Sequence, residues 1–217
     1  MAVPFGCAGS IVTGAPATRD YPVTASTAAG DTLCALVTGN NTTCTISSLT
    51  DSGGNTYTLD ASYTAAAPTQ YLFRSAGATG GPGSGPTAAL VAGTDNLILA
   101  TAAASGNIEL MAACVPGAGA ADQLPAIATG SSTTPSTSQT PAHDNETCIS
   151  AFSTAFAGGS PTVNSPFTSM GTPVQSGSNP YTAMAYDMLA GGSGVAQTST
   201  ETITAANWRA GMWTFQA

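Results

Sequence analysis

The chain has 217 residues, of which 42% are hydrophobic and only 6% are charged, and its formal net charge at pH 7 is -8. Its only basic side chains besides one histidine are three arginines, so it lacks the basic patch that binding to nucleic-acid phosphates or anionic membranes requires. The hydrophobic fraction is sufficient for a core, which argues against intrinsic disorder, and the length suits one large all-β domain.

The first 29 residues have no basic segment followed by a continuous apolar run, so no Sec signal peptide is predicted. The chain contains no apolar run of the length that a membrane-spanning helix needs. We expect residues 1–29 to form an N-terminal arm or a first strand, and residues 30–217 to form a single domain.

From residue 31 onwards, short β-type runs alternate with Gly, Pro and Asn turn signals, and no long segment shows helical periodicity. Nine strands are predicted, at 31–38, 41–51, 55–64, 69–76, 95–104, 107–117, 146–156, 181–190 and 207–217. This number of strands and their alternation predict an all-β fold, an antiparallel two-sheet sandwich that buries one face of each strand.

Two segments interrupt the strand pattern. Residues 77–87, "GATGGPGSGPT", read as a Gly/Pro loop between strands. Residues 127–147 are rich in Ser, Thr and Pro, and form either a linker between two domains or a short edge strand within one sandwich. We favour the edge strand, because neither half of the chain alone has enough predicted strands for a robust core.

The stretch "SSLTDSGGNTYTL" places one carboxylate, two glycines and an amide between two predicted strands. A Ca²⁺ loop needs several carboxylates at short spacing, and only Asp51 is present here. We therefore predict a hairpin turn, in which Gly53 and Gly54 take positive φ while Asp51 and Asn55 bond to nearby backbone. No metal ion and no cofactor are expected.

The five cysteines include no C-x-x-C pair, and His143 is the only histidine, so a zinc site is not expected. Cys34 and Cys44 lie on the two arms of a predicted hairpin, which makes a cross-strand disulfide possible. The alternative, which we favour, is that all five cysteines are small apolar core residues.

Candidate catalytic residues are isolated in the sequence. Glu109 has no partner at glycosidase spacing, and the pair His143–Asp144 lies in the Ser/Thr/Pro-rich segment without a G-x-S-x-G elbow. The chain is therefore expected not to be an enzyme. Trp208 and Trp213 are candidates for stacking against a sugar. However, they are five residues apart on one strand and must face opposite sides, so core packing is the favoured role.

The segment "GDTLCALVTGNNTTCTISSLTDSGGNTYTL" (30–59) resembles a module that recurs in tailed-bacteriophage virion proteins, of the capsid-decoration and minor-tail kinds, and in some bacterial surface proteins. The order of the later segments is similar too, including Asp122 after the strand at 107–117 and a closing Trp strand. The chain departs from the pattern at Leu49, where Val is common, and in residues 1–29. The resemblance implies a concanavalin-like jelly-roll sandwich.

The resemblance and the nearly uncharged composition predict a non-enzymatic structural protein of a phage virion that decorates or stabilises the capsid. Its partners would be capsid or tail proteins and further copies of itself, as a dimer or trimer, assembled in the cytoplasm of the bacterial host. The alternative is a carbohydrate- or receptor-binding module of a tail tip or a bacterial adhesin. That alternative predicts an exposed aromatic cluster that contacts a cell-surface glycan.

Overall fold

The computed structural model describes residues 2–12, 17–75, 88–103, 106–118, 121–155, 159–175 and 180–216. These residues contain strands and no helix, and every strand pair is antiparallel, which confirms the predicted all-β class. The strands are β1 (Phe5–Val12), β2 (Thr18–Pro22), β3 (Thr32–Gly39), β4 (Thr45–Asp51), β5 (Tyr57–Tyr63), β6 (Thr69–Ser75), β7 (Asn96–Ala103), β8 (Ile108–Val115), β9 (Ala121–Gln123), β10 (Ala128–Ser132), β11 (Ser136–Gln139), β12 (Thr147–Thr154), β13 (Thr162–Val163), β14 (Thr168–Ser169), β15 (Tyr181–Met188), β16 (Gln197–Thr202) and β17 (Ala206–Phe215).

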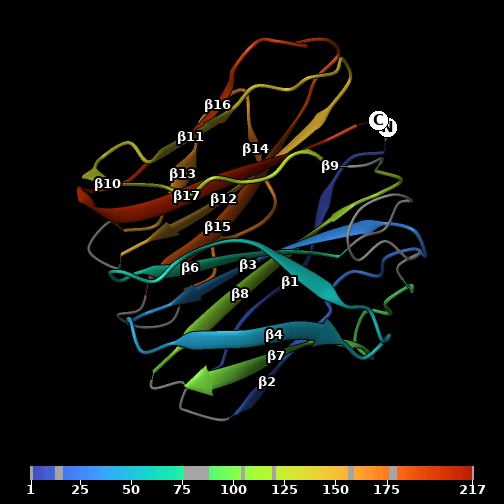
Figure 1. Ribbon diagram of the computed structural model, residues 1–217, viewed down its shortest axis with the longest axis vertical. Helices are drawn as coiled ribbons and strands as arrows, with labels where there is room; N and C mark the ends of the chain where they lie inside the picture. The colour runs from blue at the N-terminus through green and yellow to red at the C-terminus, as the bar shows by residue number, and fades with distance from the viewer. Residues whose placement is uncertain are drawn as a thin grey trace.

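Within the described residues the strands form four sheets, where the sequence predicted two. Their orders are β2-β7-β4, β1-β8-β3-β6-β5, β10-β17-β12-β15-β14 with β9 added beside β17, and β11-β16-β13. Figure 1 shows them stacked in this order, with β2-β7-β4 and β11-β16-β13 on the outside. Each outer sheet and its inner neighbour form one sandwich, and the two inner sheets pack against each other.

The second half of the chain repeats the strand order of the first half. Adding nine to each label of β1-β8-β3-β6-β5 gives β10-β17-β12-β15-β14, and the same step converts β2-β7-β4 into β11-β16-β13. The sequence offered no sign of this repeat, because the matching strands have different side chains. For example, β7 reads NLILATAA and β16 reads QTSTET.

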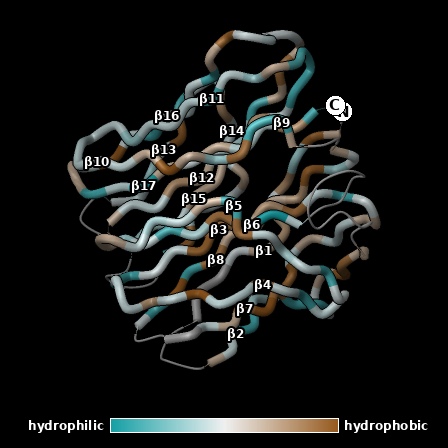
Figure 2. Tube along the Cα trace, viewed as in Figure 1, coloured by the Kyte–Doolittle hydropathy of each residue, from teal (hydrophilic) through white to brown (hydrophobic). Residues whose placement is uncertain are grey.

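Three layers of side chains separate the four sheets. The first core lies between the sheets of the first half and is rich in leucine, and the second lies between the two inner sheets. The third layer, inside the second sandwich, consists of two smaller clusters around Phe152 and Phe167. Figure 2 shows hydrophobic colours gathered on the inner strands, whereas β10, β11 and β16 are pale or hydrophilic.

The inner sheets are covered on both faces, so their central strands are buried on both sides. Every residue of β3, β8 and β12 is buried. In β3, Leu33, Ala35 and Val37 face the first core, while Cys34 and Leu36 face the second. Strands buried on both sides read as continuous apolar runs rather than as alternating patterns, which explains the sequence "TLCALVTG".

All nine predicted strands overlap observed strands, and there are eight further strands: β1, β2, β9, β10, β11, β13, β14 and β16. Two of these lie in the segment expected to be an arm or first strand, where β1 and β2 join different sheets. The segment 127–147 holds β10 and β11, each at the edge of a sheet of the second half. The predicted loop at 77–87 lies outside the described residues.

Leu72 is a sensitive position for the contact between the two inner sheets. It is fully buried in the second core, and its Cδ1 lies so close to the backbone of β17 that a Cβ on Gly211 would be 2.5 Å away. Leu72→Ala should lower the free energy of unfolding by about 2–5 kcal/mol, through lost burial and an unfilled cavity, as measured by urea denaturation. Leu59→Ala, on the exposed strand β5, is the control and should cost under about 1 kcal/mol. Equal losses in the two variants would contradict this packing.

Candidate functional site

The turn that follows β4 is built on one carboxylate. The side chain of Asp51 accepts hydrogen bonds from the backbone N–H of Asn55 (3.0 Å), the Asn55 amide (2.8 Å) and the Tyr57 hydroxyl (2.8 Å). Asn55 in turn exchanges two hydrogen bonds with the backbone of Ala88, of 3.2 and 2.6 Å. Both Asp51 and Asn55 are buried, so this group fixes the chain path at the edge of the first sandwich.

The turn is not the hairpin that the sequence predicted. β4 pairs with β7 in one sheet and β5 pairs with β6 in the next, and only a single bridge joins Thr50 to Thr56. Only Gly54 has positive φ, at 85°. At position 53 the requirement for glycine comes from space and not from φ, because a Cβ there would lie 2.9 Å from Leu90 Cδ2.

A second predicted hairpin, over residues 31–51, is also wrong. β3 lies in an inner sheet and β4 in an outer sheet, so Cys34 and Cys44 are not cross-strand partners. All five cysteines are free and buried, in agreement with the favoured interpretation. Burial raises the pKa of the Cys7 and Cys148 thiols to about 12, so these side chains pack as neutral apolar groups.

The two tryptophans lie on opposite faces of β17, as their spacing predicted. Trp208 packs in a cluster of the second sandwich and Trp213 in the core between the inner sheets. Trp213 is fully buried and Trp208 is 7% exposed, so neither ring offers a face to a sugar. Glycan stacking at these positions is therefore not supported, because stacking requires an exposed ring.

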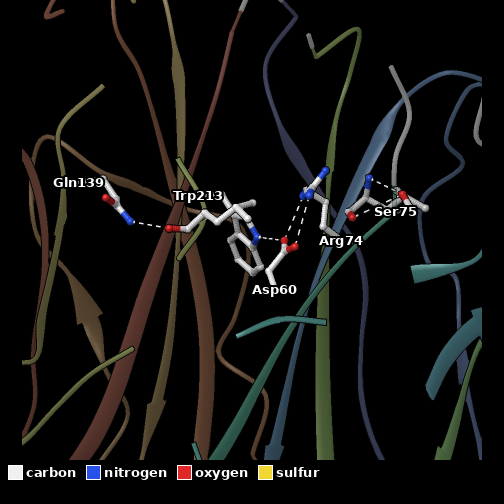
Figure 3. Close-up of polar contacts among 7 residues, drawn as sticks. Asp60, Arg74, Ser75, Gln139 and Trp213 are labelled. Atoms are coloured by element: carbon white, nitrogen blue, oxygen red, sulfur yellow. Dashed lines mark hydrogen bonds and ion pairs between the residues drawn. The ribbon is translucent and has the colours of Figure 1, made fainter. Parts of the chain in front are cut away.

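Trp213 belongs to a polar group that joins the two halves. Its indole N–H donates to Asp60 Oδ2 over 2.8 Å, and the Arg74 guanidinium binds both oxygens of the same carboxylate, at 3.0 and 3.3 Å. Figure 3 shows the three side chains in a line that crosses from β17 to β5 and β6. The side chains of Asp60 and Arg74 are 1% and 11% exposed. The ion pair therefore stands in a poorly hydrated position, where losing one partner is expensive.

Other polar contacts cross the same interface. Thr38 and Ser153 share a hydrogen bond of 2.7 Å, and the Gln70 amide donates to Ser153 over 3.1 Å. Near the other edge, the Thr182 hydroxyl donates to Glu109 Oε2 over 2.9 Å. These bonds satisfy polar groups that the double burial of the inner sheets removes from water. They also fix the two halves in one relative position.

The guanidinium of Arg209 closes this interface at its rim. It stacks on the Tyr63 ring at 4.2 Å from the centroid and also donates to the carbonyls of Ala66 and Ala67 at 3.4 and 3.5 Å. Arg209 lies on β17, whereas these partners lie on or just after β5. Arg19 is also buried and donates to the Gly106 carbonyl at 3.3 Å, so all three arginines of the chain are used within the fold.

A carboxyl pair lies at one end of the second sandwich. Asp122 on β9 accepts hydrogen bonds from the Ala142 backbone at 2.8 Å and from the Thr214 hydroxyl at 3.4 Å, and Oδ1 is 3.7 Å from His143 Nε2. Glu146 accepts from the His143 backbone N–H at 2.9 Å. Sequence reasoning singled out Asp122 and His143 separately and did not place them together, because β9 and the following loop meet only in the fold.

The environment gives the two carboxyls different proton affinities. Burial raises the pKa of Glu146 above its ordinary value, and the neighbouring Asp122 charge adds to the rise. Burial also acts to raise the pKa of Asp122, but hydrogen bonds from the Ala142 backbone, Gln123 and Glu146 outweigh it and lower that pKa. A single shared proton on Glu146 accounts for both directions. Glu146 is fully buried, so this proton does not face a substrate, and the pair serves to hold the loop.

Asp144 organises the neighbouring loop rather than orienting the histidine. Its Oδ1 accepts from the backbone N–H groups of Gly192 and Ser193, both at 3.0 Å. The His143 side chain is 56% exposed, so it lies at the surface of this loop. Among the residues that the structure describes, no group of three or more His, Cys, Asp or Glu side chains is placed to hold a metal ion.

Comparison of the chain with family models, curated proteins and solved structures gave no match. The described part of the chain also has no helix that is long and apolar enough to cross a membrane. The function must therefore be argued from the sequence resemblance and from the geometry above.

Substitution of Gly54 tests the turn that follows β4. Because no atom lies within 4 Å of the position that a Cβ would take there, a substitution changes backbone strain and little else. Gly54→Val should lower the free energy of unfolding by about 1–2 kcal/mol, seen as a melting temperature lower by several degrees. Gly54→Asn should lose less, because asparagine tolerates positive φ. A valine variant as stable as the wild type would refute the assignment.

The Asp60–Arg74 pair tests the joint between the halves. Asp60→Ala leaves the Arg74 guanidinium and the Trp213 N–H without their partner, and should cost about 3–5 kcal/mol in urea denaturation. The double variant Asp60→Leu/Arg74→Met removes both charges and should recover part of this loss. A loss below about 1 kcal/mol for Asp60→Ala would show that the pair is hydrated and peripheral.

Proposed function

We propose that this protein is a non-enzymatic structural component of a tailed-bacteriophage virion, one that decorates and stabilises the capsid. The observation that supports the proposal is the joint between the two sandwiches. An apolar core between the inner sheets is flanked by the Asp60–Arg74–Trp213 group and by the Thr38–Ser153 bond. A block joined in this way transmits force without bending, which is what a protein that bridges subunits of a shell needs.

The jelly-roll fold implied by the sequence resemblance is part of this proposal, and it applies to each half separately. In an eight-stranded jelly roll, the first, eighth, third and sixth strands share one sheet and the remaining four share the other. The order β1-β8-β3-β6 beside β2-β7-β4 supports this description. The departure is β5, which pairs with β6 instead of completing the outer sheet, and β14 does the same beside β15.

The surface of the outer sheets fits packing in a repeating array. On β11-β16-β13, apart from Val163, the exposed or half-exposed side chains are hydroxyls and amides such as Ser138, Thr198 and Thr202, and Asn164 follows β13. They bond to one another, as in Thr198 to Ser138 at 3.2 Å and Thr202 to Asn164 at 3.2 Å. Short side chains that are already fixed lose little conformational entropy when a neighbour covers them.

The proposed partners are capsid or tail proteins and further copies of the chain in a symmetric dimer or trimer. Jelly rolls also occur in lectins, and a fold alone does not decide between the two roles. The receptor-binding alternative loses its main support because Trp208 and Trp213 are buried, and we therefore prefer the structural role.

The test is to quantify the protein in purified virions of the phage that encodes it, before and after washing with salt. We expect on the order of hundreds of copies per particle. They should be retained at about 1 M NaCl, where the Debye length is only about 3 Å, because the surface offers few charges for ionic contacts. Absence from washed particles would refute the proposal, and so would release at moderate salt. Binding to host glycans that free sugar competes away would instead support the receptor-binding role.

A further inference from the structure

Glu201 stands in an unusual place for a carboxyl group. It lies on β16, the central strand of the outer sheet β11-β16-β13, and is fully buried. Its neighbour two residues before, Ser199, bonds to Ser150 of the facing sheet at 2.8 Å, so both side chains point into the second sandwich. Neither carboxyl oxygen of Glu201 has a hydrogen-bond partner among the described residues.

The fold does not require an acid at this position. In the first half the matching central strand is β7, and its fully buried side chains are Leu97 and Leu99. In the second half the buried side chains of β16 are Ser199 and Glu201. At the matching central strand, leucine side chains therefore fill the interior of the first sandwich, whereas a carboxyl group is buried in the interior of the second.

No cation neutralises this carboxyl group within the described structure. The strands beside it, β11 and β13, carry no titratable side chain. On the facing sheet, the titratable side chains on the same face as Cys148 of β12 are Asp187 and Tyr181 of β15. Glu146, two residues before Cys148, is also near enough to act on the Cys148 thiol. Burial alone raises the pKa of Glu201, to about 8, and an isolated charge is strongly disfavoured in such a place. The group is therefore protonated in the folded protein at neutral pH.

We propose that Glu201 is a pH-sensitive switch that keeps the sheet β11-β16-β13 closed while it is protonated and loosens this sheet when the proton is lost to solvent. The matching sheet β2-β7-β4, which is closed by leucine, does not respond. The second sandwich thus holds a surface that opens with rising pH, on a block whose other three sheets stay in place.

The direction follows from linkage. The carboxyl holds its proton more tightly in the folded chain than in the unfolded chain, where the ordinary value is 4.5. Its contribution to stability is therefore complete below about pH 4.5 and is lost as the pH rises to about 8. Over this window the equilibrium constant for opening rises up to about tenfold per pH unit. At low pH the chain gains little repulsion, because its bases are only three arginines and one histidine.

The experiment is amide hydrogen exchange read by mass spectrometry on the purified chain at pH 6 and pH 9, corrected for the intrinsic exchange rate. In the wild type, protection of β11 and β16 should fall by up to about a hundredfold between the two pH values, while β2 and β7 serve as the internal reference. Glu201→Gln should abolish the pH dependence. Glu201→Leu, which copies β7, is the second variant if glutamine prevents folding, and Asp20→Asn on exposed β2 is the control.

The outcomes separate clearly. Loss of protection in β16 at pH 9 in the wild type but not in Glu201→Gln supports the switch. An equal loss in the glutamine variant, or an equal loss in both outer sheets, overturns it. A loss that disappears in Asp187→Asn but persists in Glu201→Gln also overturns it and assigns the response to Asp187. The result does not depend on the virion role, which copy number tests separately.

Discussion

The constraint on which this structure depends is that both inner sheets are covered on both faces. Every residue of β3, β8 and β12 is consequently buried, and a polar group among them can find a hydrogen-bond partner only inside the protein. Thr38 and Ser153 bond to each other, and Glu109 receives the hydroxyl of Thr182. The outer sheets face water on one side, so their exposed serine and threonine hydroxyls need no partner inside the protein.

The two halves share a strand order but not a core. The first sandwich has a continuous cluster with Leu33, Leu97 and Leu99 at its centre. The second has two smaller clusters, and its interior also holds the Ser150–Ser199 hydroxyl pair and Glu201. Local opening costs less free energy where less apolar surface is buried. The outer sheet of the second half, β11-β16-β13, should therefore open more readily than β2-β7-β4. The leucine-filled half and the joint then act as its support.

The contacts between the two halves also determine which side chains remain for binding a partner. The Asp60–Arg74–Trp213 group and the Arg209–Tyr63 stack join elements that are far apart in the sequence. The third arginine, Arg19, is buried as well. Few charges are left for the surface, so contacts with a partner must rest on shape, hydroxyls and backbone. The same scarcity of bases limits charge repulsion in acid, where Glu146 and Glu201, whose pKa values burial raises, favour the folded state.

The sequence by itself determined the all-β class, the nine strands with apolar content, a turn at residues 51–55 and the opposite directions of Trp208 and Trp213, because these depend on local alternation and turn chemistry. It wrongly made that turn a hairpin, although β4 and β5 pair in different sheets. It predicted one edge strand within 127–147 where there are two, β10 and β11, and it did not reveal β16. The Ser, Thr and Gln residues of these strands carry no apolar signal, and the strands pair only because neighbouring strands offer backbone partners. It also placed β3 and β4 in one hairpin, although they lie in different sheets. The choice of sheet, the repeat of strand order, the meeting of Asp122 with Glu146 and the burial of Glu201 were decided by tertiary structure alone. Each of them depends on contacts between residues distant in the chain, and local side-chain patterns do not encode those contacts.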